Sequence, residues 1–327
     1  MVRHSFIFVA LLCAVACTSE PAPPPPPPAP TTVTSVAAVP PTGGIAVTAE
    51  QLAQADPCAL MNQDSLAKFG RVSMNIGIAF TECEMTVVMA RHDQATVQVA
   101  FRFAPPAGAK PISRNGITFH GDEDTNWCRR YIVVSEQSTI FVAASRAPVR
   151  GPACEFADAV VDGMVPQLAR GELKPAEVSP DSLARHDACH VIEFTEIRRV
   201  LGRDPVKLTP AYNRQTCTID TGGPADPSLL VTFVRGHRPE VDEKTDRAIT
   251  IDGREAVTDT WAGSGSGANR HVPSCSAELA YRPLDRPMGT KTVERLRVSV
   301  YREAPEDTNC QPATDLTAAA LRKLGGK

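Results

Sequence analysis

Eight cysteines arranged as two groups of four constrain this chain more than any other feature of its sequence. Similar residues surround the first cysteine of each group: Asp56-Pro57-Cys58 and Asp187-Ala188-Cys189 each precede a short helical pattern that ends in glycine, at Gly70 and Gly202. The last cysteine of each group opens a longer helical pattern. These correspondences predict an internal duplication of one four-cysteine unit. The two groups are Cys58, Cys83, Cys128 and Cys154, then Cys189, Cys217, Cys275 and Cys310.

The residues between the cysteines predict strands followed by a closing helix. Apolar and polar residues alternate over 97–103 and again over 296–300, which is the period of a half-buried strand. Further short apolar runs predict strands at 132–134, 140–143 and 229–234. The apolar residues Phe156, Val160, Val161, Met164 and Leu168 recur at the spacing of a helix that packs on a sheet.

We therefore predict an α+β fold with two tandem sandwich domains. Each domain is expected to be an antiparallel sheet packed by an N-terminal and a C-terminal helix. The predicted domain boundaries are 49–170 and 184–327, joined by a linker over 171–183 that contains Pro175 and Pro180.

Paired cysteines in an exported chain are expected to form disulfides. Four cysteines allow three connectivities, and the sequence does not choose among them. We favour sequential pairing, because each bond would tie a helix start to a nearby strand and stabilise the fold by roughly 3 kcal/mol. The spacing lacks the short Cys-x-x-Cys interval of structural zinc sites, so no metal is expected. The favoured pairs are Cys58–Cys83, Cys128–Cys154, Cys189–Cys217 and Cys275–Cys310.

The N-terminus has the pattern of an export signal. A short positive region precedes an apolar run over 6–16, which is too short to cross a bilayer core of about 30 Å as a helix. The run ends in Ala14-Val15-Ala16-Cys17, which resembles a bacterial lipobox. The resemblance implies that residues 1–16 are a signal peptide and that Cys17 is diacylated and becomes the mature N-terminus. The alternatives are an ordinary secretory signal and an uncleaved anchor.

Residues 17–48 are predicted to be a proline-rich tether behind the lipidated cysteine. Ten of the 29 prolines lie between Pro21 and Pro41, and such a run favours an extended polyproline II conformation. A spacer suits a membrane-anchored domain, although a proline run can also bind aromatic grooves.

No motif in the chain carries a recognisable catalytic or cofactor site. Ser65-Leu66-Ala67-Lys68 matches the Ser-x-x-Lys nucleophile motif, but its Ser-Asp-Asn and Lys-Thr-Gly partner motifs are absent from the sequence. His186 and His190 flank a cysteine already assigned to the four-cysteine pattern, and the acidic run 122–124 lacks calcium-loop spacing. The glycine-rich segment 263–267 has no following Lys-Ser or Lys-Thr and is expected to be a loop. We therefore expect no catalytic residue, no metal and no cofactor.

Two tryptophans and the net charge complete the candidate features. Trp261 precedes the glycine-rich segment and is a candidate ligand-facing aromatic, with a core position as the alternative. Trp127 adjoins Cys128 and is expected to pack on a disulfide. The net charge of −3 and the absence of a basic cluster argue against a nucleic-acid partner, which would need counterion displacement by clustered Lys and Arg.

These features together resemble a family of actinobacterial lipoproteins catalogued as domain of unknown function 3558. The resemblance rests on the lipobox, the tether, Asp56-Pro57-Cys58-Ala59-Leu60, Gly70, and the positions of Cys83 and Cys154. It would cover about residues 50–325 as two copies, the second looser because Ala188 stands where the family prefers proline. It implies a surface lipoprotein of high-GC Gram-positive bacteria and brings no established activity.

The sequence thus predicts an extracytoplasmic lipoprotein anchored to the outer face of the cell membrane through Cys17. We expect a non-catalytic module that binds or senses an envelope ligand or a protein partner. The alternatives are a cell-envelope hydrolase with a site built from dispersed residues, and a structural spacer. A cleft with buried, perturbed carboxylates or histidines would favour the hydrolase.

Overall fold

Each half of the chain begins with a cysteine turn that an aspartate stabilises. The Asp56 carboxylate accepts a hydrogen bond of 3.0 Å from the Cys58 backbone N–H, and Asp187 accepts one of 2.9 Å from Cys189. Such a cap satisfies a donor that the first turn of a helix leaves free. The turns are the short 3-10 helices η1 (Pro57–Leu60) and η4 (Ala188–His190).

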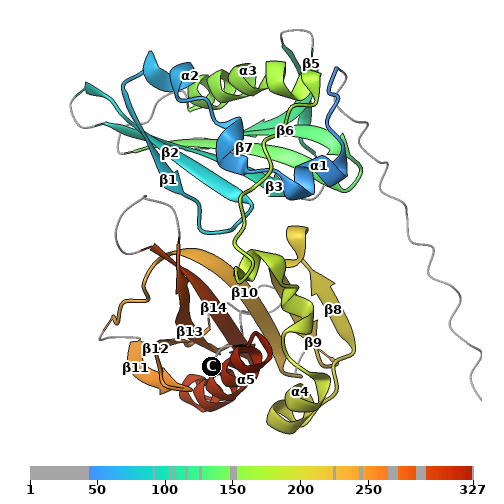
Figure 1. Cartoon of the computed structure of the whole chain (residues 1–327), viewed down its shortest axis with the longest axis vertical. Coiled ribbons are helices and arrows are strands. Elements are labelled where there is room, and N and C mark those ends of the chain that lie inside the picture. Colours follow the sequence, from blue (N-terminus) through green and yellow to red (C-terminus); the bar gives the residue numbers. More distant parts are fainter. Residues whose placement is uncertain are drawn as a thin grey trace, which may run out of the picture. The chain divides into compact units, whose positions relative to one another are not determined.

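The structure is a computed structural model (Figure 1). It describes residues 44–325 except 91–92, 103–104, 107, 115–116, 125–126, 148–152, 224–225, 243–245, 264–271 and 285–291. The described residues belong to one compact unit of the chain. The predicted signal peptide, Cys17 and most of the predicted tether lie outside the described residues. None of the helices in the described part has the length and hydropathy of a membrane span.

The first half is a seven-stranded antiparallel sheet with short helices before it and a long helix after it. Its strands follow the order β1-β2-β3-β7-β6-β5-β4. Helix α3 lies across one face of this sheet (Figure 1). The elements are α1 (Ala49–Gln54), α2 (Gln63–Ala67), β1 (Arg71–Ile76), β2 (Glu82–Val88), β3 (Gln94–Arg102), β4 (Lys110–Arg114), β5 (Ile117–Glu123), β6 (Trp127–Ser135), β7 (Ser138–Ala147) and α3 (Cys154–Arg170).

The second half repeats this topology. Its sheet has the order β8-β9-β10-β14-β13-β12-β11, which matches the first sheet strand by strand, and helix α5 packs on β13 and β14. The prediction of two tandem α+β sandwiches is confirmed. The elements are η3 (Leu183–Arg185), α4 (Phe194–Leu201), β8 (Lys207–Pro210), η5 (Tyr212–Arg214), β9 (Thr216–Asp220), β10 (Ser228–His237), β11 (Asp246–Ile251), β12 (Arg254–Trp261), β13 (Ser274–Pro283), β14 (Thr292–Tyr301), η7 (Glu306–Asn309) and α5 (Cys310–Lys323).

Each core lies between the sheet and its long helix. The alternation predicted for β3 and β14 is present, and it places their apolar side chains in the two cores. Phe103, at the end of the first predicted strand, lies outside the described residues. The five apolar residues expected on α3 are all buried in the first core. Since aromatic residues make up only 5% of the chain, both cores consist mainly of Val, Leu, Ile and Ala side chains.

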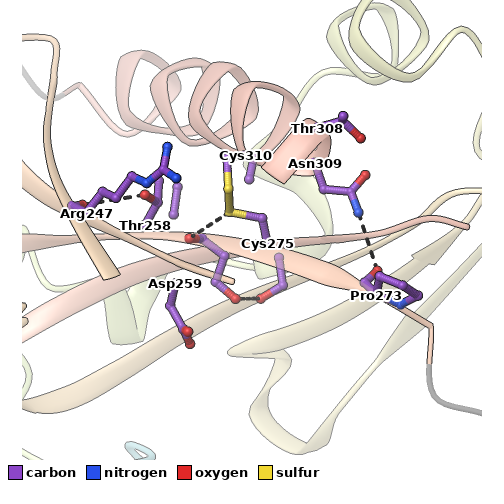
Figure 2. Close-up of a disulfide and its surroundings, with 12 residues drawn as sticks. Arg247, Thr258, Asp259, Pro273, Cys275, Thr308, Asn309 and Cys310 are labelled. Carbon is purple, nitrogen blue, oxygen red and sulfur yellow. Dashed lines mark hydrogen bonds between the residues drawn. A yellow bond between two sulfur atoms is a disulfide. The ribbon is translucent and has the colours of Figure 1, made fainter. Parts of the chain in front are cut away.

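Four disulfides join the helix starts to the strands in sequential order. They connect Cys58 to Cys83, Cys128 to Cys154, Cys189 to Cys217 and Cys275 to Cys310. In each half, the first bond ties the capped turn to the second strand and the second bond ties the long helix to the sheet. Figure 2 shows Cys310 at the start of α5 above Cys275 on β13.

The segment predicted as a linker takes part in the structure of both halves. Pro175 forms an isolated antiparallel bridge with Ala55, and Asp56 donates its backbone N–H to the carbonyl oxygen of Lys174 at 2.9 Å. At the other end, Leu183 is fully buried in the second core. Leu183 therefore packs as part of the second half.

We expect Cys154→Ala to destabilise the ectodomain by about 3 kcal/mol, because the lost bond closes a loop between residues 26 apart in sequence. Denaturant unfolding would measure the stability, and thiol titration of the denatured, unreduced variant would find one thiol, from Cys128. The double variant Cys128→Ala/Cys154→Ala is the control, and it should show no thiol. Four titratable thiols in the unreduced wild-type ectodomain would contradict the disulfide pattern.

Candidate functional site

A cleft of about 450 Å³ opens beside helix α1 and the segment that joins the two halves. Its volume lies in the range of roughly 300–1,000 Å³ typical of small-molecule sites. The wall contains polar, charged and apolar side chains. The lining residues are Ala53, Gln54, Ala55, Asp56, Pro57, Cys58, Phe80, Pro175, Ala176, Glu177, Val178, Ser179, Ser182, Ala184, Arg185, Gln215, Arg235, Arg282, Leu284 and Glu294.

Glu294 is the more deeply buried of two buried carboxylates that line this cleft, with 2% of its surface exposed against 6% for Asp56. It lies on β14 in phase with the core residues Leu296, Val298 and Val300, so alternation points its side chain to the face that packs against α5. One carboxylate oxygen accepts the Ser182 hydroxyl at 2.6 Å, and the other accepts the Leu183 backbone N–H at 2.7 Å. Glu294 therefore fixes the start of η3 to the sheet.

Burial raises the pKa of the Glu294 carboxyl, because the charged form loses its solvation. The hydrogen bonds from Ser182 and Leu183 favour the charged form and oppose this shift, as does the Arg282 guanidinium. A buried acid with a raised pKa in a cleft is a common feature of functional sites.

A β-bulge places Arg282 beside this acid. The pairing of β13 with β14 shifts its register between Ala280 and Arg282, and a bulge of this kind redirects the side chains that follow it. The guanidinium lies 3.5 Å from Glu294 and 3.5 Å from Asp181. The hydrogen bond from Ser179 lowers the pKa of Asp181, and Arg282 lowers it further.

Two more arginines line the cleft and are held by backbone carbonyl groups. Arg235 donates to the carbonyl oxygens of Ala79 at 2.8 Å and Glu82 at 2.7 Å, and its guanidinium lies over the Phe80 ring at 5.3 Å from the centroid. Arg185 donates from Nε to Ser179 and from Nη2 to Val178, at 3.1 and 3.0 Å. These bonds fix the positions of the guanidinium groups.

The arrangement suits binding better than catalysis. The Ser182 hydroxyl donates to Glu294 and also accepts the Ala184 backbone N–H at 3.1 Å. A hydroxyl used in this way as a helix cap is poorly placed to act as a nucleophile. The lining residues named above include no histidine, and their one cysteine, Cys58, is in a disulfide. Of the three acids that line the cleft, Asp56, Glu177 and Glu294, the most deeply buried one, Glu294, is held by Ser182, Leu183 and Arg282.

The structure places the residues singled out in the sequence away from this cleft. Trp261 ends β12 with 41% of its surface exposed, and it does not line the cleft. Ser65 donates its hydroxyl to the Asn62 carbonyl at 2.7 Å, while Lys68 lies over the Phe69 ring. Cys17, predicted to be lipidated, lies outside the described residues.

The other candidate segments are surface features. Arg129 lies 3.1 Å from Asp122 and 3.3 Å from Asp124, so arginine side chains neutralise the acidic run. His190 is exposed beside Asp187. Trp127 is 41% exposed. The glycine-rich segment beyond Gly263 lies outside the described residues.

Sequence reasoning missed Glu294 and Arg282, although one signal was present. Glu294 is an acid in phase with three apolar residues of a predicted strand, which marks a charge pointing toward the core. Arg282 had no such signal, because its orientation depends on the bulge in β13.

Comparison with known protein families finds no match, and comparison with curated proteins finds none. Among solved structures, one similarity is to DynU16, a protein of the dynemicin biosynthetic locus. It is 14% identical, covers 85% of this chain and 91% of that chain, and has a TM-score of 0.15. A similarity at this level carries no argument about fold or function. The resemblance to domain of unknown function 3558 therefore stays a prediction.

We expect the raised pKa of Glu294 to make the stability of the protein pH-dependent. A carboxyl whose pKa is raised by folding stabilises the fold fully below its ordinary pKa of 4.5, and this contribution is lost as pH rises through the raised value. Glu294→Gln has the same shape and does not titrate. The melting temperature of wild type relative to Glu294→Gln should therefore fall as pH rises above 4.5. Parallel pH profiles for the two proteins would contradict this assignment.

Proposed function

We propose that the chain is a lipid-anchored, extracytoplasmic binding protein, and that the cleft beside α1 takes an amphipathic anion. The observation that carries the proposal is the cleft itself, in which backbone carbonyl groups hold the guanidinium groups of Arg185 and Arg235 beside apolar wall residues. The ligand is a small molecule or a partner segment with an anionic group at one end and an apolar surface at the other.

The proposed location is supported by the disulfides and the N-terminal sequence. Four disulfides fit a domain outside the reducing cytoplasm. The segment Ala14-Val15-Ala16-Cys17 supplies the lipidation signal, and the proline-rich residues behind it supply a spacer of extended chain. The acyl chains on Cys17 form the membrane anchor, and two or more such chains are needed for stable attachment.

The proposed ligand charge follows from the arginines. Among the described residues, Arg185 makes hydrogen bonds to carbonyl oxygens, which hold its position without neutralising its charge. An incoming carboxylate, phosphate or sulfonate would form charge-assisted hydrogen bonds with such a group. Phe80, Pro57 and Leu284 provide apolar surface for the rest of the ligand.

A hydrolase with a dispersed site is the second candidate, and Glu294 is the observation in its favour. A buried carboxyl with a raised pKa is suited to general acid catalysis. Its hydrogen bonds to Ser182 and Leu183 and its contact with Arg282 instead assign it to the framework of the cleft. We therefore favour binding.

An aromatic sulfonate, 8-anilinonaphthalene-1-sulfonate, is a suitable probe of the cleft. Wild-type ectodomain should bind it saturably, as measured by calorimetry. Ala53 is exposed at the cleft wall, so Ala53→Trp should weaken binding at least about tenfold, equal to about 1.4 kcal/mol, by occupying the space. Ala67→Trp, at an exposed alanine on α2 outside the cleft, is the matched control. No saturable binding, or an equal loss in both variants, would reject the cleft as the site.

Cys17→Ser should release the protein from membranes, because it removes the acylated thiol. Fractionation of cells into membrane and soluble material would measure the distribution. Cys13→Ser is the matched control and should leave the protein in the membrane fraction, since Leu12 before Cys13 is too bulky for the lipobox. Retention of Cys17→Ser in membranes would show that another anchor exists.

A further inference from the structure

The two sheets share one topology but differ in chemistry on the face opposite the long helix. In the first sheet the centre of this face is apolar, with ion pairs of Arg102 with Glu82 and of Arg129 with Asp122 beside it. Tyr131 lies opposite Phe141 on the neighbouring strand, and Phe141 lies opposite Ala100 on the next. The two ring centroids are 5.2 Å apart, and all three residues are buried.

The corresponding row of the second sheet is polar. An interval of 156 residues separates Val142 from Val298 and also Cys154 from Cys310, so position 297 corresponds to Phe141. The strand register supports this correspondence. Arg297 lies between Glu278 and Thr232 on the neighbouring strands, as Phe141 lies between Tyr131 and Ala100. An arginine, a glutamate and a threonine thus replace an aromatic pair and an alanine. The first sheet demonstrates that this topology does not require polar residues at these three positions.

Arg295, Arg297 and Glu278 line a hollow of about 340 Å³, and ion pairs and hydrogen bonds connect the polar side chains of this face. Arg295 lies 2.9 Å from Glu278. Arg297 lies 3.2 Å from Asp259 and donates to the Ser276 hydroxyl at 3.1 Å. Figure 2 shows Asp259 pointing away from the side of the sheet that carries Cys275 and α5.

The hydrogen bonds of this group are not complete. Arg295 and Arg297 face Glu278 and Asp259, and Asp246 lies opposite Asp259 on β11, so this group has one more acid than arginine. The Nε–H of Arg295 is buried and has no hydrogen-bond partner among the described residues. Gly236 makes room for this side chain, since a Cβ there would lie 3.1 Å from Arg295 Nη2. Leaving a buried donor unpaired costs stability, so folding alone does not account for Arg295.

Two aromatic residues lie at one end of the same face. Trp261, Ser274 and Tyr301 are register neighbours on three adjacent strands. Trp261 lies two residues after Asp259 on β12, and strand alternation therefore places both side chains on one face. Tyr301 lines the hollow, and Trp261 is 41% exposed. On this face, aromatic side chains that can pack against a ligand therefore lie near charged hydrogen-bond donors and acceptors.

We propose that this face of the second sheet, around Arg295, Arg297, Glu278, Asp259, Trp261 and Tyr301, binds a neutral glycan chain. Sugar hydroxyls both donate and accept hydrogen bonds, so they can use guanidinium and carboxylate groups that are already paired with each other. The C–H face of a sugar ring is apolar and packs on an aromatic ring. An anionic polymer would meet three acids on this face, which are Glu278, Asp259 and Asp246. The site is separate from the cleft and does not depend on the function proposed for it.

Calorimetry with chitohexaose and cellohexaose tests the site, with an oligomer of galacturonic acid of equal length as the anionic comparison. The wild-type ectodomain should bind at least one of the neutral oligosaccharides saturably, and more tightly than the anionic one. Trp261→Ala should weaken this binding about fivefold, and Arg297→Ala about tenfold.

Two controls separate this site from general effects. Trp127→Ala removes a tryptophan of equal exposure from the first sheet and should leave binding within twofold of wild type. Ala53→Trp, which fills the cleft, should also leave it unchanged. Circular dichroism would verify that each variant is folded. No binding of either neutral glycan, tighter binding of the anionic oligomer, or an equal loss in Trp127→Ala would overturn the proposal.

Discussion

The rest of the structure depends on the covalent attachment of each helical segment to its sheet. In both halves an aspartate caps a short turn, the turn presents a cysteine, and that cysteine is bonded to the second strand of the sheet. A second bond holds the start of the long helix against the sheet. Since aromatic side chains are scarce, aliphatic side chains make up most of both cores. The cross-links offset part of the entropy lost on folding.

This framework allowed the two halves to diverge without losing their shared fold. The strand order is the same in both, yet one outer face carries Tyr131 and Phe141 where the other carries Glu278 and Arg297. The second half also contributes Glu294, Arg282 and Arg235 to the cleft. The first half supplies the apolar counterpart, with Pro57 and Phe80 in the cleft wall. The second half thus supplies most of the charged side chains of the cleft wall.

The fold was largely predictable because its determinants are local. Alternation in β3 and β14, the helical spacing in α3, and the cysteine order are all visible as short-range patterns. Glu294 was visible in principle, as an acid in phase with core residues. The partners of Glu294 were not, because Ser182 and Leu183 are more than a hundred residues away in sequence. Pairing over such a distance depends on how the linker returns to the sheet.

The sequence alone determined the duplicated architecture, the positions of its strands and long helices, and the predicted export and anchoring signal. These follow from side-chain period, proline content and the spacing of cysteines, which act over a few residues each. Only the tertiary structure decided which disulfide connectivity forms, where the cleft lies, and how Arg282 is aimed by a bulge. It also decided that Arg297 and Glu278 share one face with Trp261. Such features arise from register between strands distant in the chain, and register is fixed by packing of the whole sheet.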